Sequence, residues 1–154
     1  MKKIITYLAV LGVCCSAFSY AAVQGDRFMQ SEEAVQQAVY GHIDAKGLQA
    51  LLEAQVPLVL LDARGPNWHD NNVIPGAKLA FYTDSAEELA ALVPNPESLV
   101  VVYCFSFSCP LSPRLAQKLA ELGYKNVVEY PAGLKEWRDV AHYPVENIAA
   151  ETRS

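Results

Sequence analysis

The distribution of apolar and polar residues along this chain predicts buried strands separated by amphipathic helices. Apolar runs, which are typical of strands inside a sheet, predict strands at residues 58–64, 78–81, 99–103 and 126–130. Between these runs, apolar positions return to one face every three or four residues, as they do in amphipathic helices. The predicted helices run from Asp44 to Leu52, Ser85 to Leu92, Ser112 to Leu122 and Leu134 to Val140.

Three of these helices have recognisable boundary residues. Asp44, Ser85 and Ser112 carry short polar side chains that can cap a helix, and Gly123 follows the third helix. Pro113 fits the first turn of that helix, where a missing N–H costs no hydrogen bond. Strands that alternate with helices of about ten residues form parallel sheets with covered faces. We therefore predict an α/β fold with a central parallel sheet and helices on both faces.

The first residues have the composition of a signal peptide. Lys2 and Lys3 precede an apolar run at 4–17, and small residues that suit cleavage follow. The run is shorter than the roughly 20 residues that span a membrane. We expect export to the periplasm or secretion, and no membrane attachment after cleavage. The expected division is a signal peptide at 1–21, an arm or linker at 22–42, one domain at 43–145 and a C-terminal tail at 146–154.

Charge and composition restrict the partners and cofactors of this chain. The formal net charge is −5, and removal of Lys2 and Lys3 would make it −7. An acidic protein without clustered basic residues is not expected to bind nucleic acid or an anionic membrane surface. The histidines, His42, His69 and His142, are too far apart in sequence to form a recognisable metal motif. We expect no metal and no cofactor.

Cys104 has the sequence setting of a nucleophile. Cys14 and Cys15 lie in the expected signal peptide, which leaves Cys104 and Cys109 of the four cysteines. Cys104 follows the strand at 99–103 and faces the start of a helix, where unpaired N–H groups favour an anion. Such positions lower the pKa of a cysteine from about 8.5 to roughly 3.5–7.5. The alternative is that Cys104 packs as a small apolar side chain.

Five short motifs, in this order along the chain, resemble those of the rhodanese family of sulfurtransferases. They are LLDAR at 60–64, IPGA at 74–77, VVVYC at 100–104, LGYKNV at 122–127 and AGLKEW at 132–137. The resemblance implies an enzyme in which a loop cysteine takes sulfane sulfur from a small donor such as thiosulfate. The cysteine holds this sulfur as a persulfide and yields it to a thiol or another thiophilic acceptor.

The same resemblance implies roles for individual residues. Cys104 matches the cysteine that carries the persulfide, and main-chain amides of the four residues after it would surround the sulfur. Asp62 and Arg64 match an aspartate and an arginine of the family, so we expect Arg64 to bind substrate and Asp62 to support it. Alternatively, these two residues form an ion pair that braces neighbouring loops. The candidate substrate-binding residues are Arg64, Phe105, Ser106, Phe107 and Ser108.

The loop after Cys104 departs from the family pattern. It lacks the usual glycine and basic residue, and it is longer than in compact members. A bulkier, apolar loop without an arginine suggests a substrate other than a small, highly charged anion. Related phosphatases need an arginine at the end of this loop to hold phosphate, and this chain has Pro110 there, which argues against phosphatase activity.

Cys109 has several possible roles, and each implies a different function for the chain. It could resolve an oxidised or persulfidated Cys104 by forming a disulfide. It could itself be the nucleophile, because it precedes a helix as the reactive thiol of thioredoxin-like proteins does, or it could only pack. The alternatives to a sulfurtransferase are therefore a thiol–disulfide oxidoreductase that uses Cys104 and Cys109, and a noncatalytic rhodanese-like binding module.

Overall fold

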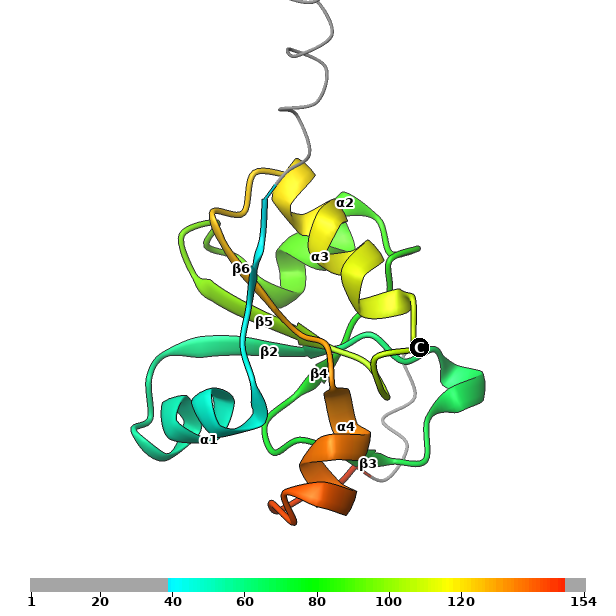
Figure 1. Cartoon of the computed structure of the whole chain (residues 1–154). Helices are drawn as coiled ribbons and strands as arrows, with labels where there is room; N and C mark the ends of the chain where they lie inside the picture. The colour runs from blue at the N-terminus through cyan, green and yellow to red at the C-terminus, as the bar shows by residue number, and fades with distance from the viewer. Residues whose placement is uncertain (1–38, 149–154) are drawn as a thin grey trace, which may run out of the picture. The chain divides into compact units, whose positions relative to one another are not determined.

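Five parallel strands form the central sheet in the computed structural model, which describes residues 39–148 (Figure 1). Their order is β1-β6-β5-β2-β4, so β5 is the middle strand. The strands are β1 (Gly41–His42), β2 (Leu58–Asp62), β4 (Lys78–Leu79), β5 (Leu99–Tyr103) and β6 (Asn126–Tyr130). The predicted parallel sheet is confirmed, and β5 and β6 have the predicted bounds.

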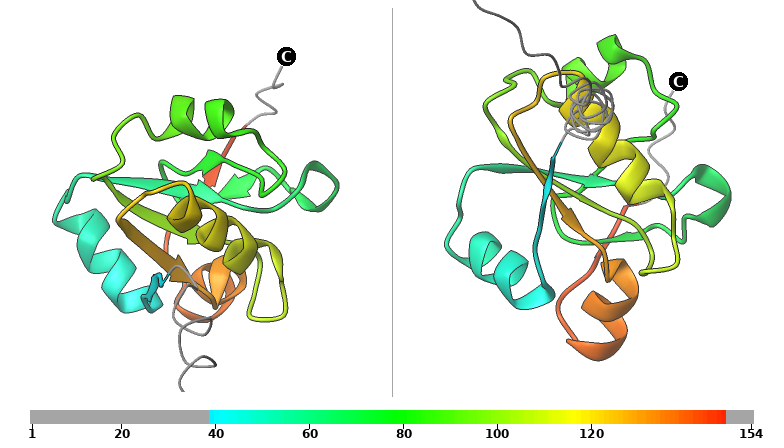
Figure 2. Two further views of the ribbon diagram at one scale, coloured as in Figure 1. Left: turned by 90° about the horizontal axis from the view of Figure 1, so that it is seen from above. Right: turned by 45° about the horizontal axis from the view of Figure 1, so that its top comes forward.

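Helices cover both faces of the sheet (Figure 2). One face packs against α1 (Ala45–Glu53) and α4 (Gly133–Lys135), which continues into the π-helical turn η3 (Glu136–Val140). The other face packs against α2 (Ala86–Leu92) and α3 (Leu111–Glu121). The α/β fold predicted from the sequence, with helices on both faces, is therefore confirmed.

Two of the predicted caps begin their helices. The Asp44 carboxylate accepts a hydrogen bond from the Gly47 N–H at 2.7 Å, at the start of α1. Ser85 and Glu88 form a reciprocal pair at the start of α2, in which each side chain accepts from the main-chain N–H of the other residue. This arrangement satisfies N–H groups that a helix start otherwise leaves unpaired.

Side chains of β5 divide between the two layers of the core. Val100 and Val102 belong to the cluster with α2 and α3, whereas Val101 and Tyr103 belong to the cluster with α1 and α4. All four side chains are buried. Successive residues of a strand point to opposite faces, so a middle strand between two helical layers is apolar at every position. The chain that leaves β5 therefore emerges at the carboxyl edge of the sheet, between the two layers.

The start and end of α3 differ from the prediction. The helix begins at Leu111, after Pro110, so Ser112 is not its cap. The Ser112 hydroxyl instead donates to the buried Glu129 carboxylate of β6 at 2.8 Å. Leu122, the last residue of the predicted helix, is 41% exposed because it follows the last turn of α3.

Two short strands, β3 (Asn72–Val73) and β7 (Glu146–Asn147), pair in the antiparallel direction beside the main sheet. Both β1 and β7 lie outside the expected domain bounds of 43–145, and both pair with strands inside them.

The expected signal peptide at 1–21 and most of the arm at 22–42 lie outside the described residues. Across residues 39–148, no helix has both the length and the apolar character needed to span a bilayer.

Candidate active site

Cys104 lies at the carboxyl end of the middle strand of the sheet. It directly follows β5, and the neighbouring strand β2 ends beside it, with Asp62 paired to Tyr103. Cys104 is 2% exposed, and a disulfide joins it to the half-buried Cys109. The two Cα atoms are 6.2 Å apart. The sequence left open whether these cysteines pair, and the structure joins them.

A cavity of about 610 Å³ lies beside this disulfide. It is lined by Arg64 and Trp68 from the segment after β2, and by Cys104, Phe105, Ser106, Ser108, Cys109, Pro110 and Leu111. Four of the five candidate substrate-binding residues therefore border one space with both cysteines. Phe107 does not; it is 77% exposed and lines two smaller cavities on the side of the loop that faces His42 and Val140.

The main chain of the loop is fixed at its start and carries several unused amides. The carbonyl oxygens of Cys104 and Phe105 accept hydrogen bonds from the N–H groups of Leu134 and Lys135, at 3.0 and 2.8 Å. The Cys109 N–H donates to the Ser106 carbonyl at 2.9 Å. The amides of residues 105–108 donate to no acceptor within the described part of the chain. Unused amides beside a cysteine suit a sulfur anion.

Gly133 is a supporting residue that the sequence motifs did not single out. It begins α4 with a φ of +64°, a conformation that favours glycine. A Cβ atom at this position would lie 2.3 Å from the Cys104 carbonyl oxygen and 2.8 Å from the Phe105 carbonyl carbon. Only a glycine lets α4 approach the loop this closely. The glycine of the AGLKEW motif could have suggested such a contact, but the motif does not say what Gly133 touches.

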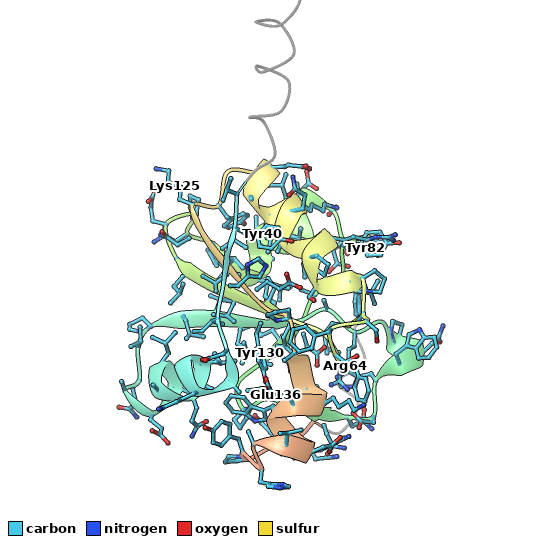
Figure 3. All side chains as sticks on the ribbon, in the orientation of Figure 1. Tyr40, Arg64, Tyr82, Lys125, Tyr130 and Glu136 are labelled. Carbon is cyan, nitrogen blue, oxygen red and sulfur yellow. A yellow bond between two sulfur atoms is a disulfide. The ribbon has the colours of Figure 1, made fainter. Side chains whose placement is uncertain are left out.

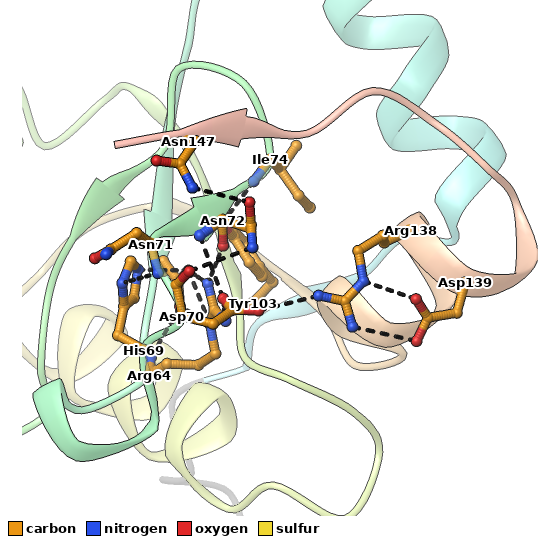
Figure 4. A network of polar contacts seen from close by, with 11 residues as sticks. Arg64, His69, Asp70, Asn71, Asn72, Ile74, Tyr103, Arg138, Asp139 and Asn147 are labelled. Carbon is orange, nitrogen blue, oxygen red and sulfur yellow. Dashed lines mark hydrogen bonds and ion pairs between the residues drawn. The ribbon is translucent and has the colours of Figure 1, made fainter. Parts of the chain in front are cut away.

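Arg64 is buried and held by three partners (Figure 4). Its Nε and Nη2 atoms donate to the Asp62 carboxylate at 2.7–3.0 Å, and its Nη1 donates to Asp70 at 2.9 Å. Its Nη2 also donates to the Asn72 carbonyl. Burial opposes the charge, but the hydrogen bond to Asp62 raises the pKa of Arg64 above its usual value. The arrangement has the geometry of a brace, although Arg64 also borders the cavity.

Asp70 extends this brace to the last helical segment. Arg138 of η3 donates to Asp70 at 3.0 Å and also to Asp139 at 2.7 Å (Figure 4). Partial burial acts to raise the pKa of Asp70, but the hydrogen bonds from Arg64 and Asn72 outweigh it and lower the pKa to about 2. Asp70 is therefore ionised at neutral pH and links two arginines that are distant in sequence.

Two tyrosine hydroxyls form hydrogen bonds in the layer that contains α1 and α4. The Tyr103 hydroxyl accepts a hydrogen bond from the Ile74 N–H at 3.0 Å, and burial raises the pKa of Tyr103 well above its usual range. The Tyr130 hydroxyl, at the end of β6, donates to Glu136 at 2.9 Å (Figure 3). These contacts fix the ends of β5 and β6 beside the loop.

Trp68 and His69 are adjacent in sequence, but one side chain is exposed and the other is buried. Trp68 ends the short helix η2 (Pro66–Trp68), is 78% exposed and lines the cavity of the cysteines. The His69 side chain is buried, and its Nδ1 atom accepts a hydrogen bond from the Asn71 N–H at 3.1 Å. Its Nε2 atom lies 3.7 Å from the Asp62 carboxylate and has no hydrogen-bond partner among the described residues. No group of three potential metal ligands occurs within residues 39–148.

One family model matches the region that holds this site. Residues 44–139 match the family model of the rhodanese-like domain. Comparison with curated proteins finds no match.

Solved structures with a similar fold include several bacterial proteins. The BH2092 protein of Bacillus halodurans is 21% identical over 78% of this chain and 85% of that one, with a TM-score of 0.62. The rhodanese-like domain of an Anabaena protein is 23% identical over 75% of this chain and 85% of that one, with a TM-score of 0.58. The thiosulfate sulfurtransferase of Pseudomonas aeruginosa is 23% identical over 78% of this chain, with a TM-score of 0.57, and the match spans 22% of that protein.

Proposed function

Because this chain belongs to the rhodanese-like domain family, we propose that it is a sulfurtransferase in which Cys104 carries sulfane sulfur to a thiophilic acceptor. The observation that carries this proposal is the position of Cys104. It follows the middle strand, borders a cavity of about 610 Å³ and precedes four residues whose amides have no acceptor among the described residues. These features support a thiolate in the reduced protein and a persulfide anion after sulfur uptake.

The proposed reaction has two displacement steps. The Cys104 thiolate attacks the outer sulfur of a donor such as thiosulfate, the sulfur–sulfur bond of the donor breaks, and sulfite leaves with the electron pair. Attack by a thiophile such as cyanide on the outer sulfur of the persulfide then releases the Cys104 thiolate. The unused amides of residues 105–108 would stabilise the negative sulfur in each state.

Replacement of the nucleophile tests this proposal. We expect Cys104→Ser to lower thiosulfate-to-cyanide sulfur transfer by at least about a thousandfold, because a serine hydroxyl is not ionised at neutral pH. The reduced wild-type protein should form sulfite on treatment with thiosulfate, whereas the variant should not.

A surface substitution provides the control for this experiment. Glu97 pairs with Lys125 at the end of the sheet opposite Cys104, so Glu97→Gln should retain full activity. Comparable melting temperatures of reduced wild-type protein and Cys104→Ser would exclude a folding defect. Full sulfur transfer by a folded Cys104→Ser protein would refute the role of Cys104.

The disulfide favours a second candidate function, that of a thiol–disulfide oxidoreductase. Cys104 and Cys109 are bonded to each other, and the Cys109 side is the more exposed. Reduction of insulin by this protein in the presence of a dithiol, without any sulfur transfer from thiosulfate, would favour this function over the sulfurtransferase.

A further inference from the structure

The loop after Cys104 brings a second thiol into bonding position with the proposed sulfur carrier. The Cys109 N–H bonds to the Ser106 carbonyl at 2.9 Å, and the hydroxyl oxygens of Ser106 and Ser108 lie 3.0 Å apart. These contacts fold the loop back on itself, so that the Sγ atoms of Cys104 and Cys109 form a bond. The resemblance to the rhodanese family implies a persulfide on one cysteine, Cys104, and gives Cys109 no role.

The two sulfur atoms differ in their surroundings. Cys104 is 2% exposed and its carbonyl is hydrogen-bonded to α4, whereas Cys109 is half-buried and directly precedes Pro110 at the start of α3. Both residues border the same cavity. Because Cys109 is the less buried of the two residues, we expect a molecule that enters the cavity from solvent to reach its sulfur more readily than that of Cys104.

We propose that Cys109 resolves the Cys104 persulfide and releases hydrosulfide inside the loop. This inference rests on the proposed sulfurtransferase function. The Cys109 sulfur attacks the Sγ atom of Cys104, the bond between Sγ and the outer sulfur breaks, and the outer sulfur leaves as hydrosulfide with the electron pair. The proton of the Cys109 thiol ends on the hydrosulfide, and the product is the observed disulfide.

An external dithiol completes the cycle. One of its thiolates attacks the sulfur of Cys109, the less buried residue, and expels the Cys104 thiolate, which lies beside the unused amides of the loop. The second thiol of the reductant then attacks the mixed disulfide and frees Cys109. In total, the sulfane sulfur of the donor is reduced to hydrosulfide and the dithiol is oxidised to its disulfide. The class of acceptor is thus a dithiol reductant rather than a simple thiophile.

Single-turnover measurements on the full chain test the resolving step. The protein is reduced, freed of reductant, and mixed with thiosulfate, and sulfite, hydrosulfide and intact mass are followed. The wild-type protein should release about one sulfite and one hydrosulfide per chain and lose the free thiols of Cys104 and Cys109. Cys109→Ser should release the sulfite, retain an added mass of about 32 Da, and form hydrosulfide at least about tenfold more slowly, because the intramolecular attack is lost.

The outcomes separate this inference from the proposed function. If wild-type protein keeps the added sulfur on Cys104 as long as Cys109→Ser does, the resolving role is wrong and the proposed function stands. If peptide mapping finds the sulfur on Cys109, both the resolving role and the carrier role of Cys104 are wrong, although the chain still takes up sulfur. If neither protein releases sulfite or gains mass from thiosulfate or from a cysteine persulfide, the sulfurtransferase itself is wrong. Reduced wild-type protein and Cys109→Ser should melt at similar temperatures, because both lack the disulfide.

The resetting step has its own test. The oxidised wild-type protein is treated with glutathione, and free thiols are then blocked with a maleimide. Glutathione should be found on Cys109 and the maleimide on Cys104. The reverse pattern would overturn the assigned direction of attack.

Discussion

The function of a charged residue beside the cavity depends on how many of its donors are already in use. Arg64 borders the cavity, but its Nε, Nη1 and Nη2 atoms donate to Asp62, Asp70 and the Asn72 carbonyl. Asp62 is fully buried, so loss of the guanidinium would leave a buried carboxylate without its partner, which is strongly destabilising. The geometry therefore favours positioning of the segment after β2 over direct capture of an anion, and the substrate-binding role of Arg64 stays a prediction.

The ion pair between Arg64 and Asp70 predicts a specific pH dependence of stability. The pKa of Asp70 is lowered from 3.8 to about 2, so folding favours its ionised form. The resulting stabilisation is present above pH 4 and is lost as the pH falls from about 4 to about 2. We expect Asp70→Asn to lower the free energy of unfolding at neutral pH by about 1 kcal/mol or less, since Asp70 is nearly half exposed.

Denaturant unfolding between pH 2 and 7 measures this effect. The difference between wild-type protein and Asp70→Asn should shrink toward pH 2. Glu97→Gln, which removes a surface carboxylate paired with Lys125, serves as a control with the same change in charge. A wild-type advantage that grows as the pH falls would contradict the assigned role of Asp70.

The position of the loop depends on how closely α4 approaches it. The first turn of α4 donates two hydrogen bonds to the carbonyl oxygens of Cys104 and Phe105, and the missing side chain of Gly133 makes this contact possible. The loop is therefore held by an element that lies about 30 residues later in the chain, on the face of the sheet with α1. The sheet supplies the edge, and α4 fixes the shape of the loop at that edge.

Substitution of Gly133 tests this contact. Gly133→Ala introduces both an unfavourable positive φ and a methyl group 2.3 Å from the Cys104 carbonyl oxygen. We expect a loss of stability of roughly 1–3 kcal/mol or more from backbone strain, together with a fall in sulfur transfer as the loop shifts. Thermal unfolding and thiosulfate-to-cyanide transfer measure the two effects.

Gly123→Ala is a matched control. Gly123 also has a positive φ, of +92°, but a Cβ atom there would meet nothing within 4 Å. This variant should lose some stability and keep its activity. Equal loss of activity in both variants would show that the contact of Gly133 with the loop has no special importance.

On the scale of the whole molecule, the acidic charge and the lining of the cavity restrict the donor. The chain carries a formal net charge of −5, and Arg64, already paired with carboxylates, is the one charged residue among the described residues that line the cavity. A doubly charged donor such as thiosulfate is repelled by this field at a distance and finds no unpaired cation inside. We therefore expect a less charged organic donor to suit the cavity better than thiosulfate.

The ionic-strength dependence of sulfur transfer tests this conclusion. Raising the ionic strength from about 0.02 M to about 0.15 M screens the repulsion, so the KM for thiosulfate should fall by about twofold or more. A singly charged donor, such as an aromatic thiosulfonate, should show a smaller change. A KM for thiosulfate that rises with salt would indicate a positive site that attracts the donor.

The sequence by itself determined most of the main helices and strands of this fold and the place of Cys104, the proposed nucleophile. Apolar runs and helical periodicity are local patterns, so β5, β6 and the capped starts of α1 and α2 could be read without any knowledge of their neighbours. Cys104 follows the run at 99–103, and a parallel sheet places such a position at its carboxyl edge. The motifs then supplied the family.

The tertiary structure decided everything that depends on contact between distant segments. Cys104 is bonded to Cys109, and Gly133 lies against the loop. The Ser112 hydroxyl binds a buried carboxylate and does not cap a helix. Arg64 donates hydrogen bonds to three residues, and the sequence had suggested only one of them, Asp62. Propensity and periodicity act within one segment, whereas these contacts depend on distances and directions that exist only after helices and strands have packed together.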